Sequence, residues 1–244
     1  MFGENEERNG DYKRRMTKIC ILHGWTYQTD TWKPALEMLR EKGLDCELLN
    51  IPGLTDGTNP AWTLDDYVEW LKNKTAAYEK VILIGHSNGG RISMAFAAKY
   101  PEKVAKLILE DSAGIPARGL RALKRDVFRI IAKSGSIFRK SETLRKILHT
   151  IARENDYQNA TPEMRKTMAN LGSVDFDPIF QKIKIPTLII WGEHDVTTPL
   201  ANGNIMHAKI SNSRMVVIPG ARHSPHITHT REFTDLIAEE LKHS

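Results

Sequence analysis

The sequence is poor in three features, and each shortage excludes a class of protein. It has only two cysteines in 244 residues, Cys20 and Cys46, and both lie inside apolar runs. Two such cysteines do not make the disulfide framework of a small secreted protein, so we expect buried thiols in a reducing compartment and a cytoplasmic protein. No apolar run approaches the roughly 20 residues that cross a bilayer. Residues 1–15 lack the apolar stretch of a signal peptide, and we expect a flexible tail there.

The net charge of +5 is concentrated in one segment. Residues 1–117 carry 15 basic and 17 acidic side chains, whereas residues 118–146 alone carry 10 basic and 2 acidic ones. Neither a recognition motif nor interleaved stacking aromatics accompany this charge, so we expect no nucleic-acid partner. We also expect no stable membrane insertion. A solvated helix face is the simplest interpretation of the segment, and contact with an acidic carrier protein or a membrane surface is the alternative.

Short apolar runs alternate with helical patterns along most of the chain. The predicted strands are residues 18–22, 45–51, 81–84, 104–109, 187–191 and 215–218. Strands that are apolar throughout and alternate with amphipathic helices indicate a mostly parallel sheet with both faces covered. One predicted helix begins after Thr63 as N-cap, and Asp66 completes a capping box. The prediction is therefore an α/β fold with a central sheet of about six strands flanked by helices.

One stretch breaks this alternation. Residues 114–184 have the pattern of several successive helices, with prolines between them. We predict that they form a helical cap insertion, while residues 16–113 and 185–244 together form the α/β core. The chain length fits one large domain with such an insertion.

The third predicted strand leads into the sequence Gly85-His86-Ser87-Asn88-Gly89, which is followed by a helical pattern. This is a G-x-S-x-G motif in the strand–turn–helix context that a nucleophilic serine requires. Side chains larger than hydrogen at the two glycine positions would collide with the neighbouring strand and helix. The start of the helix adds partial positive charge where an oxyanion would form. We expect Ser87 to be a catalytic nucleophile.

A serine hydroxyl needs a base, and the base needs an orienting carboxylate. Two later strands end in suitable residues, because Asp195 follows the strand at 187–191 and His223 follows the strand at 215–218. The order Ser, acid, His is the one expected for a nucleophile on this kind of turn. We therefore expect Asp195 and His223 to be the catalytic acid and base.

Four motifs in order carry a resemblance from Lys18 to the C-terminus: His23-Gly24-Trp25, the G-x-S-x-G motif, Trp191 through Asp195, and Pro219 through His223. The sequence resembles the α/β-hydrolase superfamily, and in particular its small capped members, such as carboxylesterases, lactonases and the pimeloyl-carrier-protein methyl ester esterase. The resemblance implies that backbone N–H groups of Trp25 and Asn88 form the oxyanion hole. The resemblance also implies a reaction that requires no cofactor and no metal.

Other residues compete for these roles. Asp111 follows the fourth strand and is the alternative acid, although a structural carboxylate is the simpler interpretation. Glu193 is expected to point away from the site. His223, His226 and His229 are spaced by three, but this is not the spacing of a helical zinc site. We expect His226 and His229 to be loop or surface residues.

Substrate contacts are less constrained. We expect Gly24 and Trp25 to line the pocket, with Phe128 and Phe138 facing it from the cap. The expected reaction is cleavage of a small-molecule carboxylic ester or lactone through an acyl-enzyme intermediate. The alternatives are a hydrolase of carbon–carbon bonds (meta-cleavage products) and a ligand-binding receptor that does not turn over. The oligomeric state stays open.

Overall fold

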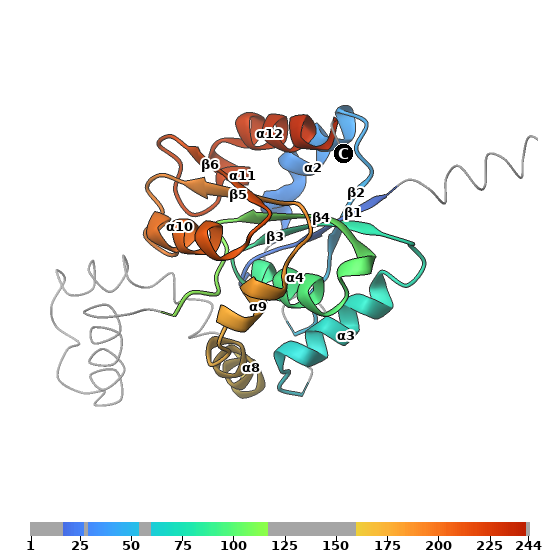
Figure 1. Cartoon of the computed structure of the whole chain (residues 1–244), viewed down its shortest axis with the longest axis vertical. Coiled ribbons are helices and arrows are strands. Elements are labelled where there is room, and N and C mark those ends of the chain that lie inside the picture. The colour runs from blue at the N-terminus through green and yellow to red at the C-terminus, as the bar shows by residue number, and fades with distance from the viewer. Residues whose placement is uncertain (1–16, 27–28, 54–59, 117–159, 243–244) are drawn as a thin grey trace, which may run out of the picture.

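The computed structural model describes residues 17–26, 29–53, 60–116 and 160–242 (Figure 1). It contains a six-stranded sheet in the order β2-β1-β3-β4-β5-β6, in which every neighbouring pair is parallel. The strands are β1 (Lys18–Leu22), β2 (Cys46–Leu49), β3 (Val81–His86), β4 (Val104–Glu110), β5 (Thr187–Gly192) and β6 (Ser213–Ile218). The predicted parallel sheet of six strands is confirmed.

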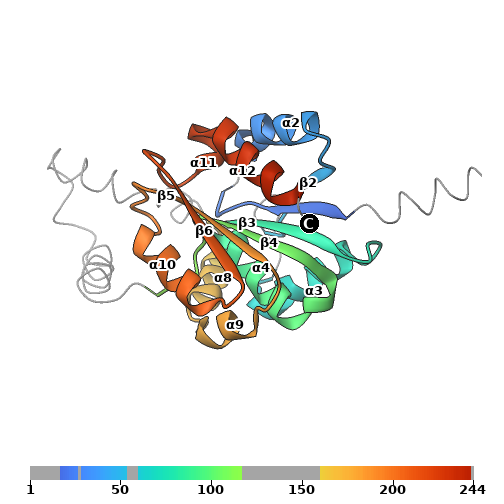
Figure 2. The ribbon, with the colours of Figure 1, turned by 45° about the horizontal axis from the view of Figure 1, so that its top comes forward.

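Helices cover both faces of the sheet, as Figure 2 shows. One face carries α2 (Lys33–Glu41), α11 (Pro225–Thr228) and α12 (Thr230–Lys242). The other carries α3 (Leu64–Lys74), α4 (Asn88–Lys99), α8 (Pro162–Gly172), α9 (Asp177–Lys182) and α10 (Leu200–Lys209). Short 3-10 turns η1 (Asp30–Trp32) and η2 (Pro101–Lys103) precede α2 and β4. Two hydrophobic clusters result, one on each face, which explains why the strand residues are apolar throughout.

The strand order reverses at β1. The chain runs from β1 outward to β2, and then returns through α3 to β3 on the other side of β1. In open parallel sheets, sites form outside the carboxyl ends of the strands near such a reversal. The segments that follow β1, β3, β5 and β6 therefore meet at one edge of the sheet.

Part of the predicted cap is described. Helices α8 and α9 lie between β4 and β5 in the chain, and α9 lies beside α4 in Figures 1 and 2. Met164, Phe176 and Phe180 from this stretch are buried in the same cluster as side chains of α4. Residues 117–159 lie outside the described residues, and with them the basic segment 118–146, Phe128 and Phe138. The cap boundaries and the N-terminal tail stay predictions.

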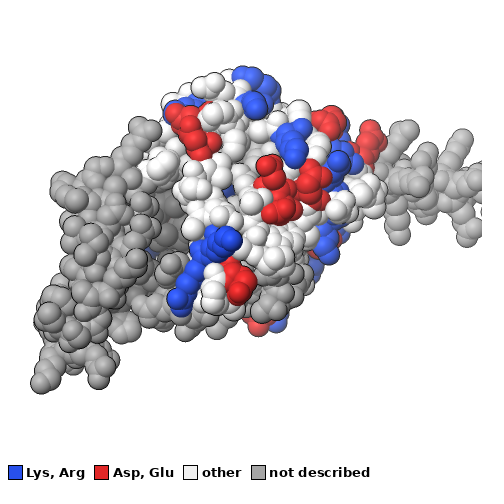
Figure 3. All heavy atoms as spheres, turned by 90° about the horizontal axis from the view of Figure 1, so that it is seen from below, with Lys and Arg blue, Asp and Glu red and all other residues white. Residues whose placement is uncertain are grey.

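Acidic and basic side chains lie next to one another on the described surface shown in Figure 3. Among the ion pairs, Lys99 on α4 contacts both Asp65 and Glu69 on α3. Within the described ranges, every helix is too short or too polar to cross a bilayer.

The capping box predicted at the start of α3 is present. The Asp66 N–H donates to the Thr63 hydroxyl oxygen at 3.3 Å, and the Thr63 N–H donates to the Asp66 carboxylate at 2.7 Å. Thr63→Ala should lower the free energy of unfolding by about 1 kcal/mol, because a first-turn N–H loses its acceptor. Denaturant unfolding followed by circular dichroism measures this. Thr63→Ser keeps the hydroxyl and should stay close to the wild type; an equal loss in both variants would contradict a capping role.

Candidate active site

Ser87 occupies a strained turn between β3 and α4. Its backbone has φ 51° and ψ −114°, a conformation that residues other than glycine rarely adopt. Three hydrogen bonds hold it: the Ser87 N–H donates to the Glu110 carbonyl at 3.0 Å, and the Ser87 carbonyl accepts from Gly90 N–H at 3.1 Å and Ala113 N–H at 2.9 Å. The turn leaves the Ser87 side chain partly exposed at the carboxyl edge of the sheet.

Close backbone contacts fix the surroundings of this turn. A Cβ atom on Gly89 would lie 2.1 Å from the Leu22 carbonyl oxygen, so α4 can reach the end of β1 only with glycine there. A Cβ atom on Gly24 would lie 2.8 Å from His86 Nδ1 and 3.1 Å from Ser87 Cβ. The segment after β1 therefore passes directly against the serine turn, which brings Gly24 and Trp25 to the site.

The structure brings Ser87, His223 and Asp195 into one hydrogen-bonded chain. His223 Nε2 lies 3.1 Å from Ser87 Oγ, and His223 Nδ1 lies 2.8 Å from Asp195 Oδ2. Both His223 and Asp195 are buried. With Asp195 accepting the Nδ1 proton, Nε2 is the basic nitrogen that faces the serine hydroxyl.

Asp195 is held by the two threonines that follow it. Its Oδ1 accepts from Thr197 N–H at 2.7 Å and Thr198 N–H at 3.0 Å, and its Oδ2 lies 2.6 Å from Thr198 Oγ1. The Thr198 hydroxyl also lies 3.2 Å from His223 Nδ1 and 3.0 Å from the Asp111 carbonyl. We did not single out Thr198 in the sequence, although an aspartate whose carboxylate accepts N–H groups two and three residues on is a common turn.

The competing carboxylates take other positions. Asp111 is fully buried with φ 42°, and its Oδ1 accepts from Gly192 N–H at 2.8 Å. Burial, together with the negative charges of Glu110 and Asp195, raises the Asp111 pKa to about 9, so this side chain is a neutral acid at pH 7. Glu193 points away from the serine and accepts from Gly220 N–H at 2.9 Å. Of the three acids, Asp195 is the one bonded to His223.

Asn88 and Trp25 belong to the two segments that meet at this turn, the start of α4 and the segment after β1. Asn88 is the first residue of α4, so its backbone N–H is one of the first-turn groups without an acceptor inside the helix. The Asn88 side chain is buried, and its Oδ1 accepts from Arg91 Nη1 at 3.3 Å. Trp25 is partly buried and packs against the cluster that contains α4. The placement of both residues is compatible with donors aimed at a substrate oxygen.

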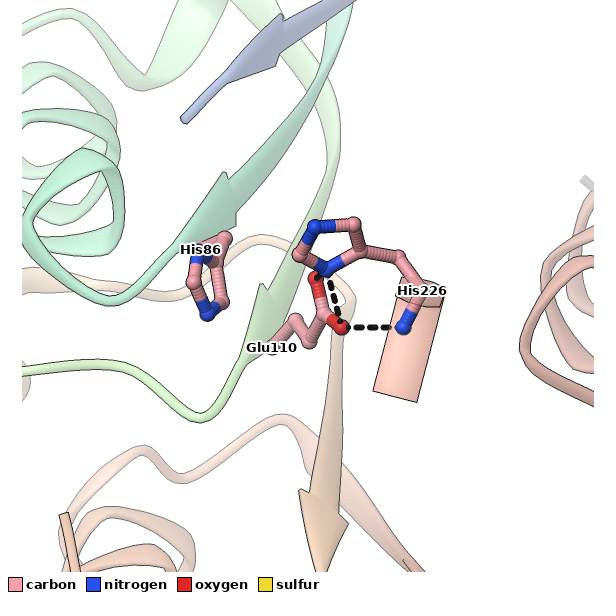
Figure 4. A group of neighbouring side chains, drawn as sticks. All are labelled: His86, Glu110 and His226. Atoms are coloured by element: carbon pink, nitrogen blue, oxygen red, sulfur yellow. Dashed lines mark hydrogen bonds and ion pairs between the residues drawn. The ribbon is translucent and has the colours of Figure 1, made fainter. Parts of the chain in front are cut away.

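His226 is not a surface residue, and the expectation above is wrong for it. It is 2% exposed, its ring stacks on Trp32 at 3.8 Å between centroids, and Glu110 binds it. Glu110 Oε1 lies 2.8 Å from both the His226 backbone nitrogen and its Nδ1 (Figure 4). The sequence did not reveal this pair because the two residues are 116 positions apart. It ties the loop that carries His223 to the end of β4.

His86 lies between the two histidines of that loop. Its ring centroid is 5.0 Å from that of His223 and 4.9 Å from that of His226, and its Nε2 is 3.4 Å from the Ser224 hydroxyl. Burial and the nearby His226 and His223 hold the pKa of His86 well below its usual range, so it is neutral. It therefore packs locally, in agreement with its place in the motif.

Two sets of buried side chains have the spacing of metal ligands. They are His86, Glu110 and His226, and His86, Asp111 and His223, each with ligand atoms within 4.8 Å of one another. In the first set, Glu110 already accepts hydrogen bonds from the His226 ring and backbone, and the His226 ring is stacked. In the second set, Asp111 holds a proton, which a metal would have to displace. The first set is therefore satisfied by contacts inside the protein, whereas Asp111 Oδ2 in the second set is buried without a hydrogen-bond partner among the described residues.

Comparison with known proteins identifies relatives of this chain. Residues 18–230 match the family described as alpha/beta hydrolase fold. The pimeloyl-[acyl-carrier protein] methyl ester esterase of Aeromonas hydrophila is 25% identical, over 90% of this chain and 93% of that protein. A 2-hydroxy-6-oxononadienedioate/2-hydroxy-6-oxononatrienedioate hydrolase of Pseudomonas putida is 27% identical, over 68% of this chain and 64% of its own. A thermophilic esterase from Thermogutta terrifontis has a similar structure, with a TM-score of 0.69, 24% identity, and coverage of 93% and 89% of the two chains.

The neutral state of Asp111 has a consequence for stability. Its pKa rises from 3.8 to about 9 on folding, so between these values the folded protein holds a proton that the unfolded chain releases. The Asp111 contribution to the free energy of unfolding therefore falls as pH rises from about 4 to about 9. Asp111→Asn cannot titrate, so its stability relative to the wild type should increase steadily across this range. Thermal unfolding from pH 5 to pH 8.5 measures the difference.

A matched control removes an exposed carboxylate. Asp65 on α3 has an 86% exposed side chain, and Asp65→Asn should show a difference from the wild type that changes little with pH. If Asp111→Asn behaves in the same way, Asp111 is ionised in the folded protein and the interpretation fails.

Proposed function

Because the chain belongs to the alpha/beta hydrolase fold family, we propose that it is a serine hydrolase that cleaves a carboxylic ester or lactone. The observation that supports this most directly is the chain of hydrogen bonds from Ser87 Oγ through His223 to Asp195, at 3.1 Å and 2.8 Å. In this proposal Ser87 is the nucleophile, His223 the general base and acid, and Asp195 the group that orients His223.

In the first half-reaction, His223 Nε2 removes the Ser87 proton while Oγ attacks the carbonyl carbon. The backbone N–H groups of Trp25 and Asn88 donate to the oxyanion of the tetrahedral intermediate, and the start of α4 adds its partial positive charge. His223 then gives the proton to the leaving alkoxide, and an ester remains on Ser87. Asp195 stabilises the charged imidazole throughout and stays ionised.

In the second half-reaction, water replaces the alcohol. His223 removes a proton from the water, the hydroxide attacks the acyl carbon, and His223 returns the proton to Ser87 as the acid leaves. Thr198 assists both steps indirectly, because it fixes the Asp195 carboxylate that aligns the imidazole. The same groups can serve the cleavage of a carbon–carbon bond next to a ketone. The Pseudomonas putida relative favours this as the second candidate.

The nucleophile is tested by labelling and turnover together. A fluorophosphonate should label the wild type and should not label Ser87→Ala. A panel of 4-nitrophenyl esters, lactones and meta-cleavage ketones should reveal a substrate whose turnover falls about 10⁴-fold or more in Ser87→Ala. Absence of both labelling and turnover in the wild type would contradict the proposed enzymatic function and favour a ligand-binding receptor.

The acid is tested by a pair of isosteric variants. Asp195→Asn should lower kcat by about 10⁴-fold, because the amide favours the wrong tautomer of His223. Asp111→Asn replaces a neutral acid by a neutral amide and should lower kcat far less. Steady-state kinetics on the best ester of the panel measures both. The reverse order of effects would transfer the catalytic role to Asp111.

A further inference from the structure

Arg91 is a positive charge without a counter-ion inside the described part of the protein. It lies on the first turn of α4, four residues after Ser87. Its Nη1 donates to Asn88 Oδ1 at 3.3 Å, and its Nε is buried without a hydrogen-bond partner. Among the residues that the structure describes, no carboxylate forms an ion pair with it. The contrast with Lys99 on the same helix, which reaches two carboxylates, is clear.

A buried charge without a counter-ion destabilises the folded protein. Burial lowers the Arg91 pKa to about 10, and the hydrogen bond to the neutral Asn88 side chain supplies no negative charge to offset it. Charged groups that leave water are normally paired, because an isolated buried charge costs several kcal/mol. A ligand is one source of the counter-ion that the described residues do not supply.

The geometry of α4 places this charge beside the nucleophile. Side chains on a helix lean toward its N-terminus, and residues three and four apart share a face. Arg91 therefore leans toward Ser87 and Asn88, and its bond to Asn88 Oδ1 demonstrates this direction. This bond uses the oxygen of the Asn88 side-chain amide. The nitrogen of the same amide, Asn88 Nδ2, is also buried and has no hydrogen-bond partner among the described residues. The two unused donors, Arg91 Nε and Asn88 Nδ2, thus belong to side chains that contact each other within one helical turn of Ser87.

A carboxylate is the group that fits these donors. It has two oxygens that accept in one plane, it supplies the missing negative charge, and arginine binds it with short charge-assisted bonds. A neutral ester oxygen or ketone would satisfy one donor and leave the charge uncompensated.

We propose that Arg91, together with Asn88 Nδ2, binds a carboxylate group of the substrate, so that the natural substrate is an ester or lactone that also carries a free acid. This inference rests on the proposed function for the reacting bond, while the binding of the free acid can be measured without turnover. Arg91 is a specificity residue in this scheme, and Ser87 remains the nucleophile.

Two substrates of equal chain length test the proposal. 4-Nitrophenyl hydrogen adipate carries a terminal carboxylate, and 4-nitrophenyl hexanoate has a methyl group in its place. The wild type should prefer the adipate by at least about 10-fold in kcat/KM, and Arg91→Gln should lower this preference by about 10- to 100-fold. Arg91→Lys keeps the charge and should recover part of the preference. Arg231→Gln removes an equal charge from exposed α12 and should leave the preference unchanged.

Binding without turnover separates this proposal from the proposed function. Adipate should raise the melting temperature of the wild type and should not raise that of Arg91→Gln. This result supports the site even if no ester is hydrolysed and no fluorophosphonate label is found. Stronger stabilisation by inorganic phosphate than by adipate would overturn the choice of a carboxylate.

Two outcomes would overturn the role of Arg91 itself. One is an equal loss of activity on both esters in Arg91→Gln, together with slower fluorophosphonate labelling, which would make Arg91 a support for Ser87. The other is a wild type that shows no preference for the adipate and no thermal shift with it.

Discussion

The strained backbone at Ser87 is the constraint on which the rest of the site depends. A serine with φ 51° persists only where its surroundings hold it, and here two of the holding groups are the Glu110 carbonyl at the end of β4 and the Ala113 N–H in the segment that follows β4. The position of Ser87 therefore depends on the pairing of β3 with β4. The same turn ends β3 and starts α4, so the serine, its neighbouring N–H and the helix dipole come from one local structure.

Three acidic side chains are buried around this turn, and each is accommodated in a different way. Asp195 accepts hydrogen bonds from the turn that follows it and from His223. Glu110 accepts from the ring and backbone of His226. Asp111 keeps its proton at pH 7, because burial, together with the negative charges of Glu110 and Asp195, raises its pKa to about 9. Asp195 is thus the carboxylate that is hydrogen-bonded to His223, while its closest competitor, Asp111, is neutral.

The parts of the site that sequence could predict are those carried by local patterns. Strand–turn–helix periodicity with two glycines predicted Ser87 as nucleophile, and residues at the ends of later strands predicted Asp195 and His223 as its partners; the structure places the three within hydrogen-bond distance. The exclusion of Asp111 as the acid depends on how deeply its side chain is buried. Residue spacing along the sequence does not reveal burial. His226 was expected in a loop or on the surface because its partner Glu110 is distant in sequence. Thr198 was missed although a turn pattern was there to be noticed.

The chemistry of the site and its choice of substrate have separate physical origins. Ser87, His223 and Asp195 satisfy one another inside the protein, and such a set can act on many carbonyl compounds. Arg91 is different, since its charge is not neutralised by any carboxylate among the described residues. A partly buried cation one helical turn from Ser87 lowers the free energy of a bound anion and leaves a neutral ligand without that gain. After hydrolysis, however, a second carboxylate appears on the product, and one guanidinium cannot compensate two charges. Arg91 therefore compensates only one of the two carboxylates of the product. The second carboxylate weakens product binding, and this assists product release.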